Sequence, residues 1–365
     1  MPSNWQRVRL GDIFFITAGG DLSKPHYSNT KQSDFNYPIY SNAIEKKGLY
    51  GYSSFFIIKN KSITITSRGT IGVAFFRDYP YVPIGRLLVL QPKISNIDCR
   101  FYTEYINSKV KFNTEQTTIP QLTIPKVALC EIPLPPLDEQ IAIANVLSDV
   151  DRYLYALDAL ILKKESVKKA LSFELLSQRK RLKGFNQNWQ RVRLGDILSY
   201  EQPTKFLVAT TQYLQKGFTP ILTAGKTFIL GYTNDKHGIY TNIPVIIFDD
   251  FTTDSKMVNF PFKVKSSAIK ILSLRDNNQA DLKYIYEKLT LLKHQVTDHK
   301  RYWIDEFSNF EILLPPLNEQ IAIANILSAL DNEIASLKNK KRQFENIKKA
   351  LNHDLMSAKI RVLNK

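Results

Sequence analysis

The residues that could carry chemistry in this chain are few and scattered. Its five histidines and two cysteines, Cys99 and Cys130, have the spacing of neither a zinc site nor a disulfide framework. Asp249 and Asp250, in the segment FDD, are adjacent carboxylates, and we interpret them as caps of a turn rather than as a metal-dependent nuclease centre. No GxxxxGK(S/T) phosphate loop and no GxSxG elbow occurs. We therefore expect no catalytic site, bound cofactor or metal in this chain.

The charge balance points to a kind of partner instead. The 365 residues include 50 Lys and Arg against 34 Asp and Glu, which gives a formal net charge of +16. Such an excess attracts polyanions, of which nucleic acid is the commonest. The sequence has no apolar run of membrane-spanning length, no signal peptide and few cysteines, so we expect a cytoplasmic protein that does not bind membranes.

Two segments recur along the chain. LPPLDEQIAIANVLSDVD at 134–151 returns at 314–331 with 14 of 18 positions identical, and NWQRVRLGDI at 4–13 returns unchanged at 188–197. A repeat of this kind indicates two copies of one structural unit. Between the conserved segments the copies are largely dissimilar, which is the pattern of a shared scaffold with altered surface residues.

The dissimilar parts have the composition of compact α+β domains. Stretches such as 61–76, 86–92 and 242–251 are dense in β-branched and aromatic residues and predict strands. The segments 101–110 and 281–296 predict short helices.

A long helix is predicted after each LPPL segment. The paired prolines force extended backbone, and Asp138 and Asn318 then stand where an N-cap belongs. Apolar residues follow in alternating steps of three and four, which is typical of a coiled-coil seam. No Gly or Pro interrupts 138–183 or 318–363, so each helix is predicted to run about 46 residues. A long helix lying on a domain core is the alternative, and an antiparallel pair of helices would give the repeat an internal pseudo-twofold axis.

The chain resembles the specificity subunits of type I restriction–modification systems. The resemblance is carried by W-x-x-V-R-L-G-D-I at Trp5–Ile13 and Trp189–Ile197, and by the junctions IPLPPLDEQ at 132–140 and ILLPPLNEQ at 312–320. Similar segments are TSRGTIG at 66–72, TTIPQLT at 117–123 and HKRYWIDEFS at 299–308. The family then implies two target-recognition domains joined by two long helices that form an antiparallel coiled coil. Its boundaries fall at 1–136 and 184–316 for the domains, and at 137–183 and 317–365 for the helices.

The resemblance also implies partners. Each target-recognition domain would read one half of a bipartite, asymmetric site on double-stranded DNA. The helices would set the spacing and dock two modification subunits, which methylate adenine at N6 with S-adenosylmethionine. Where the system includes restriction subunits, these would supply a motor and nuclease that need ATP and Mg²⁺. The chain itself would be non-catalytic.

Hydroxyl, amide and basic side chains suit contacts with base edges and phosphates. On that ground the predicted DNA contacts of the first domain are Ser67, Arg68, Thr70, Thr117, Thr118 and Gln121. Those of the second domain are Lys226, Thr252, Thr253, Lys256, Lys300, Arg301 and Tyr302. We expect Trp5 and Trp189 to be core anchors, and Gly69 and Gly72 to serve turn geometry.

Two other functions remain open from the sequence. A coiled-coil protein that binds nucleic acid without sequence preference would share the basic charge and would bind with steep salt dependence. A nuclease or methyltransferase with a diverged site would have to be active as a purified chain.

Overall fold

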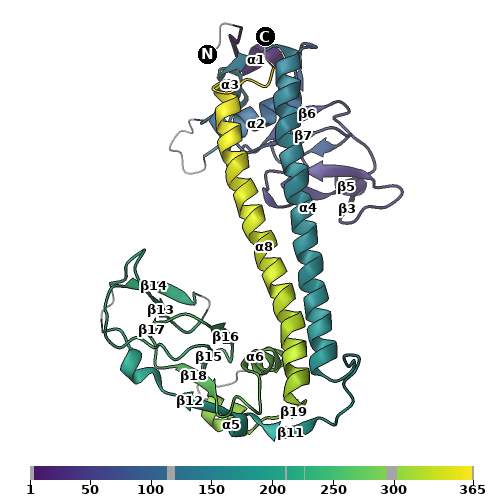
Figure 1. The fold of residues 1–365 in the computed structure, drawn as a ribbon. Helices are drawn as coiled ribbons and strands as arrows, with labels where there is room; N and C mark the ends of the chain where they lie inside the picture. The colour runs from purple at the N-terminus through teal and green to yellow at the C-terminus, as the bar shows by residue number, and fades with distance from the viewer. Residues whose placement is uncertain (1–3, 113–119, 210–211, 226, 293–301, 364–365) are drawn as a thin grey trace. The chain divides into compact units, whose positions relative to one another are not determined.

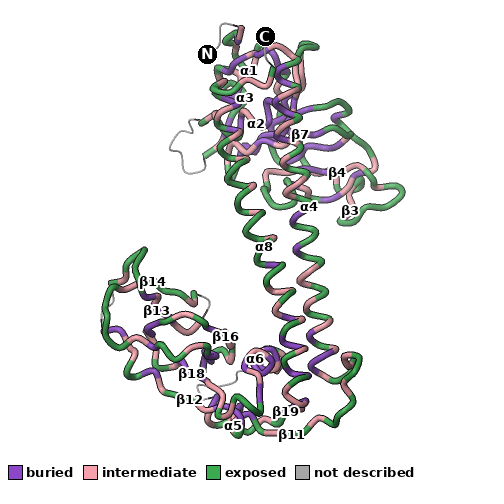
Figure 2. Tube along the Cα trace, viewed as in Figure 1, coloured by how far each residue is buried: buried purple, intermediate pink, exposed green. Residues whose placement is uncertain are grey.

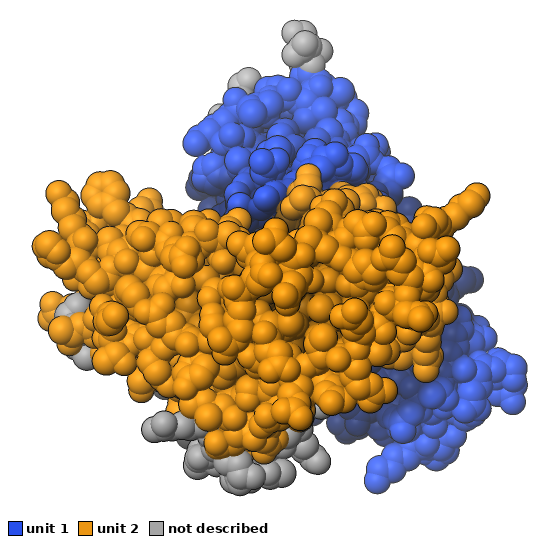
Figure 3. All heavy atoms as spheres, turned by 60° about the horizontal axis from the view of Figure 1, so that its bottom comes forward, with its two compact units in different colours: residues 1–158, 339–365 blue, residues 159–338 orange. Residues whose placement is uncertain are grey.

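The computed structural model describes residues 4–112, 120–209, 212–225, 227–292 and 302–363. The chain divides into two units (Figure 3). Unit 1 comprises residues 1–158 and 339–365, and unit 2 comprises residues 159–338. The strands and short helices at 6–134 in unit 1 and at 190–314 in unit 2 are called the first and the second domain, and each unit also contains parts of two long helices.

The first domain is built on two four-stranded sheets, ordered β2-β9-β6-β7 and β3-β5-β4-β8, and a two-stranded sheet of β1 and β10. Its strands are β1 (Gln6–Arg9), β2 (Phe14–Ala18), β3 (Tyr27–Ser28), β4 (Tyr37–Tyr40), β5 (Leu49–Ser53), β6 (Ser62–Ile65), β7 (Ala74–Arg77), β8 (Val82–Pro83), β9 (Leu88–Pro92) and β10 (Glu131–Leu134). Its helices are α1 (Leu10–Ile13), η1 (Lys24–His26), η2 (Glu45–Gly48), α2 (Cys99–Lys109) and α3 (Ile124–Ala128).

The second domain has sheets ordered β12-β18-β15-β16, β14-β13-β17 and β11-β19. Its strands are β11 (Gln190–Arg193), β12 (Leu198–Glu201), β13 (Thr219–Leu222), β14 (Ile229–Thr233), β15 (Val245–Asp249), β16 (Ser255–Val258), β17 (Lys263–Val264), β18 (Ile269–Leu274) and β19 (Glu311–Leu314). Its helices are α5 (Leu194–Ile197), η3 (Pro203–Phe206), α6 (Leu282–Leu291), α7 (Tyr302–Asp305) and η4 (Phe307–Asn309).

The two domains share one scaffold even where their sequences differ. The order β2-β9-β6-β7 corresponds strand for strand to β12-β18-β15-β16. A parallel pair, β4 with β8 and β13 with β17, also occurs in each domain. The central strands β6 and β15 are buried along their whole length, which explains their run of apolar and β-branched residues. Figure 2 shows this burial along the chain. The expected α+β fold with an internal repeat is confirmed.

Each copy of NWQRVRLGDI forms a strand that pairs with the strand directly before the paired prolines. In the first copy, Arg7 of β1 lies opposite Pro133 of β10 in an antiparallel pair. In the second copy, Arg191 of β11 lies opposite Leu313 of β19 in the same register. The two repeated segments are therefore neighbours in each folded unit.

The Glu of each LPPL(D/N)EQ segment anchors this junction. Glu139 is 2% exposed, and its carboxylate accepts from the indole Nε1 of Trp5 at 3.0 Å and pairs with Arg361 at 2.6 Å. In unit 2, Glu319 is fully buried and accepts from Trp189 Nε1 at 3.0 Å and from Arg181 at 2.6 Å. Trp5 is itself 6% exposed and Trp189 partly buried, so both tryptophans are structural anchors as expected.

The Gln that follows fastens a domain helix to the junction. Gln140 Oε1 accepts from the backbone N–H of Asp98, the N-cap of α2, at 2.9 Å, and its Nε2 donates to the carbonyl of Pro135 at 2.8 Å. Gln320 repeats both bonds, with Asp281 at the N-cap of α6 and with Pro315. The repeated EQ dipeptide therefore has a structural role in both units.

The long helices are α4 (Leu137–Leu176) and α8 (Leu317–Met356), each of 40 residues. Figure 1 shows each as one continuous helix. They are shorter than the predicted 46 residues because Gln178 and Ala358 adopt left-handed φ of 63° and 52°, which ends a helix. They also begin one residue earlier than predicted. Asp138 and Asn318 therefore lie in the first turn, and the carbonyls of Pro136 and Pro316 accept its first hydrogen bonds.

Within each unit the two helices pack antiparallel. In unit 1, Lys348 pairs with Asp151 and Lys341 with Asp158. Residues earlier in α4 therefore pair with residues later in α8. In unit 2, the ion pairs are Lys164 with Glu333, Lys168 with Asp331 and Lys338 with Glu165. Lysines of both long helices thus pair with acids on the neighbouring helix. Of the predicted seam, Leu157 and Ile161 of α4 and Ile334 of α8 are buried outside the core clusters of the two domains. Ile143, Leu147 and Leu355 belong to the core cluster of the first domain, and Leu175, Ile323 and Leu327 to that of the second.

Across the described ranges, no three His, Cys, Asp or Glu side chains gather as metal ligands would. No helix of the described part of the chain is long and apolar enough to cross a lipid bilayer.

Candidate nucleic-acid interface

Three loops of the first domain are held together by Asn42, which follows β4. Its side-chain Oδ1 accepts from the backbone N–H of Ser67 at 2.7 Å, and its Nδ2 donates to the carbonyl of Gly85 at 2.6 Å. Ser67 lies in the loop after β6, and its hydroxyl donates to the carbonyl of Arg86 at 2.7 Å. Loops at 41–42, 66–72 and 85–86 therefore form one surface on a fixed frame.

Two polar side chains of the loop after β6 are exposed. Arg68 and Thr70 are exposed, and Arg68 Nη2 donates to Gln121 Oε1 at 3.3 Å. The Gln121 segment is fixed in turn, because the N–H of Leu122 donates to the carbonyl of Ser67 at 2.9 Å. The partner of Arg68 in this bond is a neutral amide, which does not neutralise the guanidinium charge.

The predicted contact residues of the first domain separate into three groups. Arg68 and Thr70 are exposed, and Arg68 is hydrogen-bonded to the half-buried Gln121. Ser67 is fully buried with its hydroxyl bonded to Arg86, so the structure gives it a supporting role and no exposed atom for a ligand. Thr117 and Thr118 lie outside the described residues. Gly69 and Gly72 have φ of 67° and 86°, which confirms that they serve turn geometry.

The equivalent loop of the second domain follows β15 and is organised by Asp249. Its carboxylate accepts from the backbone N–H of Gly225 and Phe251, and from the hydroxyl of Thr252, each at 2.8 Å. The next residue, Asp250, accepts from the N–H of Trp303 at 3.0 Å and pairs with Lys270 at 2.7 Å. Both acids are more than nine-tenths buried. Asp249 caps the turn after β15 as predicted, whereas Asp250 bonds to Trp303 and Lys270, which are distant in the sequence.

The predicted contacts of the second domain are again only partly brought together. Thr252 is exposed on the Asp249 turn, and Thr253 beside it is half-buried with a left-handed φ of 59°. Lys256 on β16 is half-buried, with its Nζ 4.4 Å from the centre of the Phe228 ring. Tyr302 is 1% exposed and belongs to the core, so it is not part of the surface. Lys226, Lys300 and Arg301 lie outside the described residues.

The two loop systems occupy the same place on the shared scaffold. Ile65 of β6 lies opposite Leu88 of β9, and Phe248 of β15 lies opposite Lys270 of β18. Ser67 follows Ile65 by two residues, and Asp250 follows Phe248 by two residues. Ser67 and Asp250 are therefore structural equivalents. The first domain therefore presents arginine and amide groups where the second presents threonines. A single fold thus supports two chemically different surfaces.

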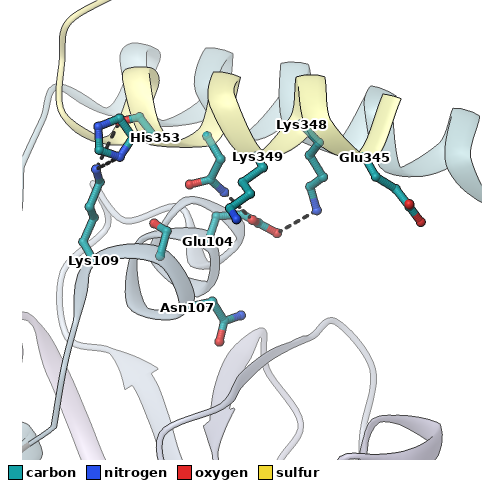
Figure 4. Close-up of a pocket in the computed structure, with 9 residues that line it drawn as sticks. Glu104, Asn107, Lys109, Glu345, Lys348, Lys349 and His353 are labelled. Carbon is teal, nitrogen blue, oxygen red and sulfur yellow. Dashed lines mark hydrogen bonds and ion pairs between the residues drawn. The ribbon is translucent and has the colours of Figure 1, made fainter. Parts of the chain in front are cut away.

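One repeated ion pair, together with a lysine hydrogen bond to a backbone carbonyl, connects a helix of each domain to the long helices. In unit 1, Lys348 of α8 contacts Glu104 of α2 at 3.9 Å (Figure 4), and Lys109 donates to the carbonyl of His353 at 3.1 Å. In unit 2, Lys168 of α4 contacts Glu287 of α6 at 3.5 Å. Lys288 donates to the carbonyl of Leu176, at the end of α4, at 2.6 Å. Each domain is thereby connected to the long helices through one domain helix, α2 in unit 1 and α6 in unit 2.

Comparison with known proteins fits this arrangement. A family model described as "Type I restriction modification DNA specificity domain" matches residues 2–165 and 186–346, once in each copy of the repeat. The chain belongs to this family. The resemblance found from the motifs is therefore confirmed, and it covers both halves of the sequence.

Among relatives, the specificity subunit of the type I restriction enzyme EcoR124I/EcoR124II of Escherichia coli is 46% identical over 180 residues, 45% of this chain and 44% of that protein. A putative type I specificity subunit of Mycoplasma pneumoniae, S.MpnORF507P, is 34% identical over 42% of this chain and 41% of its own length. The chain thus matches less than half the length of these relatives. The MjaVIII specificity subunit of Methanocaldococcus jannaschii is 24% identical over 100% of this chain and 95% of its own.

Solved structures share the fold. The S subunit of a type I restriction–modification system from M. genitalium superposes with a TM-score of 0.70 at 18% identity, over 96% of both chains. A chain from a structure of a type I R-M system, described in terms of complex assembly and conformational transition, gives 0.52 at 14% identity over 98% of both.

Proposed function

We propose that this chain is the DNA-reading specificity subunit of a type I restriction–modification complex, and that each domain recognises one half of a bipartite, asymmetric site. The observation that carries the proposal is the pair of loop systems on one repeated scaffold. The frame is the same in both domains, while the exposed residues differ, as Arg68 and Thr252 illustrate. Two different surfaces in one chain would read two different half-sites.

The long helices would set the distance between the half-sites. A helix of 40 residues is about 60 Å long, which equals roughly 18 base pairs of duplex at 3.4 Å per step. Both helices are shared by the two units, since α4 runs from residues of unit 1 into unit 2 and α8 runs in the opposite sense. A change in helix length or register would then change the gap between half-sites.

In this proposal the chemistry belongs to the partners. Two modification subunits would dock on the conserved parts of the chain and methylate adenine at N6 with S-adenosylmethionine. Restriction subunits would join where the system includes them and would use ATP and Mg²⁺. Support comes from the conservation within the chain itself, because the junctions and helix starts are duplicated nearly unchanged while the domain surfaces are not. A common partner would require that common geometry.

One alternative is favoured by a specific observation, the formal charge of +16. Charge alone would support binding to any duplex, with affinity that falls steeply as salt rises and with no preferred sequence.

The test is to produce the chain together with candidate modification subunits and to map methylated adenines across a genome. We expect one bipartite motif with a fixed gap and two unlike halves. Methylation without a consistent motif, or binding of equal strength to all duplexes, would contradict the proposal and favour the non-specific alternative.

A further inference from the structure

Arg86 stands out among the described residues with left-handed backbone. Six of these residues are not glycine: Lys46, Lys47, Arg86, Gln178, Thr253 and Ala358. Gln178 and Ala358 end the long helices, and the two lysines lie in the turn η2. Arg86, at φ of 68°, lies in the exposed loop before β9, on the surface that also carries Arg68. Glycine or asparagine would adopt this φ at a lower energetic cost than arginine. The presence of arginine at this position therefore needs an explanation in terms of its side chain.

The backbone at Arg86 is fixed from several sides. Its N–H donates to the carbonyl of Gly19 at 3.1 Å, and its own carbonyl accepts from Ser67 Oγ at 2.7 Å. The preceding Gly85, also left-handed with φ of 65°, donates to Gly20 at 2.8 Å and accepts from Asn42 Nδ2 at 2.6 Å. The loop therefore presents the Arg86 side chain from a preset position, and the unfavourable φ is maintained by the surrounding hydrogen bonds.

The same bonds place a second arginine close along the surface. Ser67 holds the Arg86 carbonyl, and the next residue is Arg68, whose guanidinium is joined to Gln121. Two exposed guanidinium groups and an amide thus arise from neighbouring loops on one frame. A guanidinium offers paired donors in a plane, which match the O6 and N7 acceptors of guanine in the major groove.

We propose that Arg86 is a specificity-determining residue of the first domain, and that its guanidinium donates to a guanine within the half-site read by that domain. This inference rests on the proposed function. It adds a residue that the motifs did not indicate, since Arg86 belongs to none of the segments shared with the family.

The left-handed backbone allows a variant that removes the guanidinium and keeps the fold. Asparagine tolerates φ near 68°, so Arg86→Asn should retain or raise the melting temperature. The matched control is Lys46→Asn, which removes one positive charge from another exposed, left-handed position of the same domain, with φ of 48°. Arg86→Lys keeps the charge but loses the paired donors.

The experiment measures binding of the reconstituted complex to its own site and to duplexes with single base changes in each half. We expect Arg86→Asn and Arg86→Lys to lose discrimination at one G·C pair of one half-site, by roughly 5- to 150-fold, the range of one bidentate contact. The other half-site and the Lys46→Asn variant should be unchanged.

Unchanged discrimination in both Arg86 variants would overturn the inference. The inference would also fail if affinity fell equally for all sequences and the slope of log affinity against log salt concentration decreased in magnitude by about one, because that pattern indicates a phosphate contact. If the wild-type complex itself showed no sequence preference, the proposed function would fail instead, so the two failures are distinguishable.

Discussion

The ion pair between Asp250 and Lys270 gives a prediction that can be worked out from the repeat. The two groups are 2.7 Å apart, and their side chains are 5% and 3% exposed. At the equivalent positions the first domain has Ser67 and Leu88, and Leu88 is 2% exposed. One copy of the scaffold thus buries a charge pair where the other buries an apolar side chain beside a hydroxyl.

Removal of one charge of the pair should lower the free energy of unfolding far more than removal of both charges. Lys270→Leu alone leaves the Asp250 carboxylate buried without its cation, and such a loss typically destabilises by about 3–5 kcal/mol. Solvent screens the interaction between these two charges only weakly, because both side chains are almost fully buried. For a unit of this size the melting temperature should fall by roughly 6–20 °C. The double variant Lys270→Leu/Asp250→Asn should recover most of that loss, since the introduced side-chain amide would still accept from the N–H of Trp303.

The assay is differential scanning calorimetry of the full chain for the wild type, both single variants and the double variant. We expect the melting transition to shift to lower temperature in the single variants and to return towards that of the wild type in the double variant. If Lys270→Leu cost less than about 1 kcal/mol, or if the double variant were as unstable as the sum of the singles, the reasoning about the buried pair would be wrong.

Three other perturbations have defined outcomes. Burial lowers the pKa of Lys288 to about 8, so between that pH and the ordinary lysine value near 10.4 the unfolded chain holds more protons and stability should rise with pH. In the Lys288→Gln variant, the increase in the free energy of unfolding from pH 7 to pH 10, measured by urea denaturation, should be smaller by about 1–3 kcal/mol. Insertion of two residues before Leu157 rotates the following helix by about 200°, so mapped methylation should show an altered gap or none; an unchanged gap would remove the spacing role. Arg68→Gln should weaken binding to one half-site only, measured with half-site-substituted duplexes, and equal weakening everywhere would reassign it to a phosphate.

The sequence predicted most of the scaffold because its signals were local or duplicated. Proline pairs and heptad spacing located the long helices, and dense β-branched runs located β6, β9 and β15. The helices were predicted to extend too far along the sequence. Glycine usually marks a left-handed residue at a helix end, whereas the types of Gln178 and Ala358 do not predict this conformation. The pairing of NWQRVR with the strand before the prolines required the fold, because Arg7 and Glu131, whose side chains meet across these strands, are 124 residues apart.

The surface residues were harder to predict because residue type does not reveal burial. Ser67 and Tyr302 have the chemistry of DNA contacts, yet the first supports a neighbouring loop and the second fills the core. Asn42 and Arg86 were missed for the opposite reason. Their roles depend on hydrogen bonds between loops far apart in sequence, and only the left-handed φ of Arg86 distinguishes it.

The most direct test of the central claim is to exchange residues 198–313 for the corresponding part of another member of the family, with both long helices left intact. Methylated adenines would then be mapped in cells that carry the modification subunits. We predict that one half of the bipartite motif changes to that of the donor, while the other half and the gap stay the same. A change in both halves, or in neither, would contradict the assignment of one half-site to each domain.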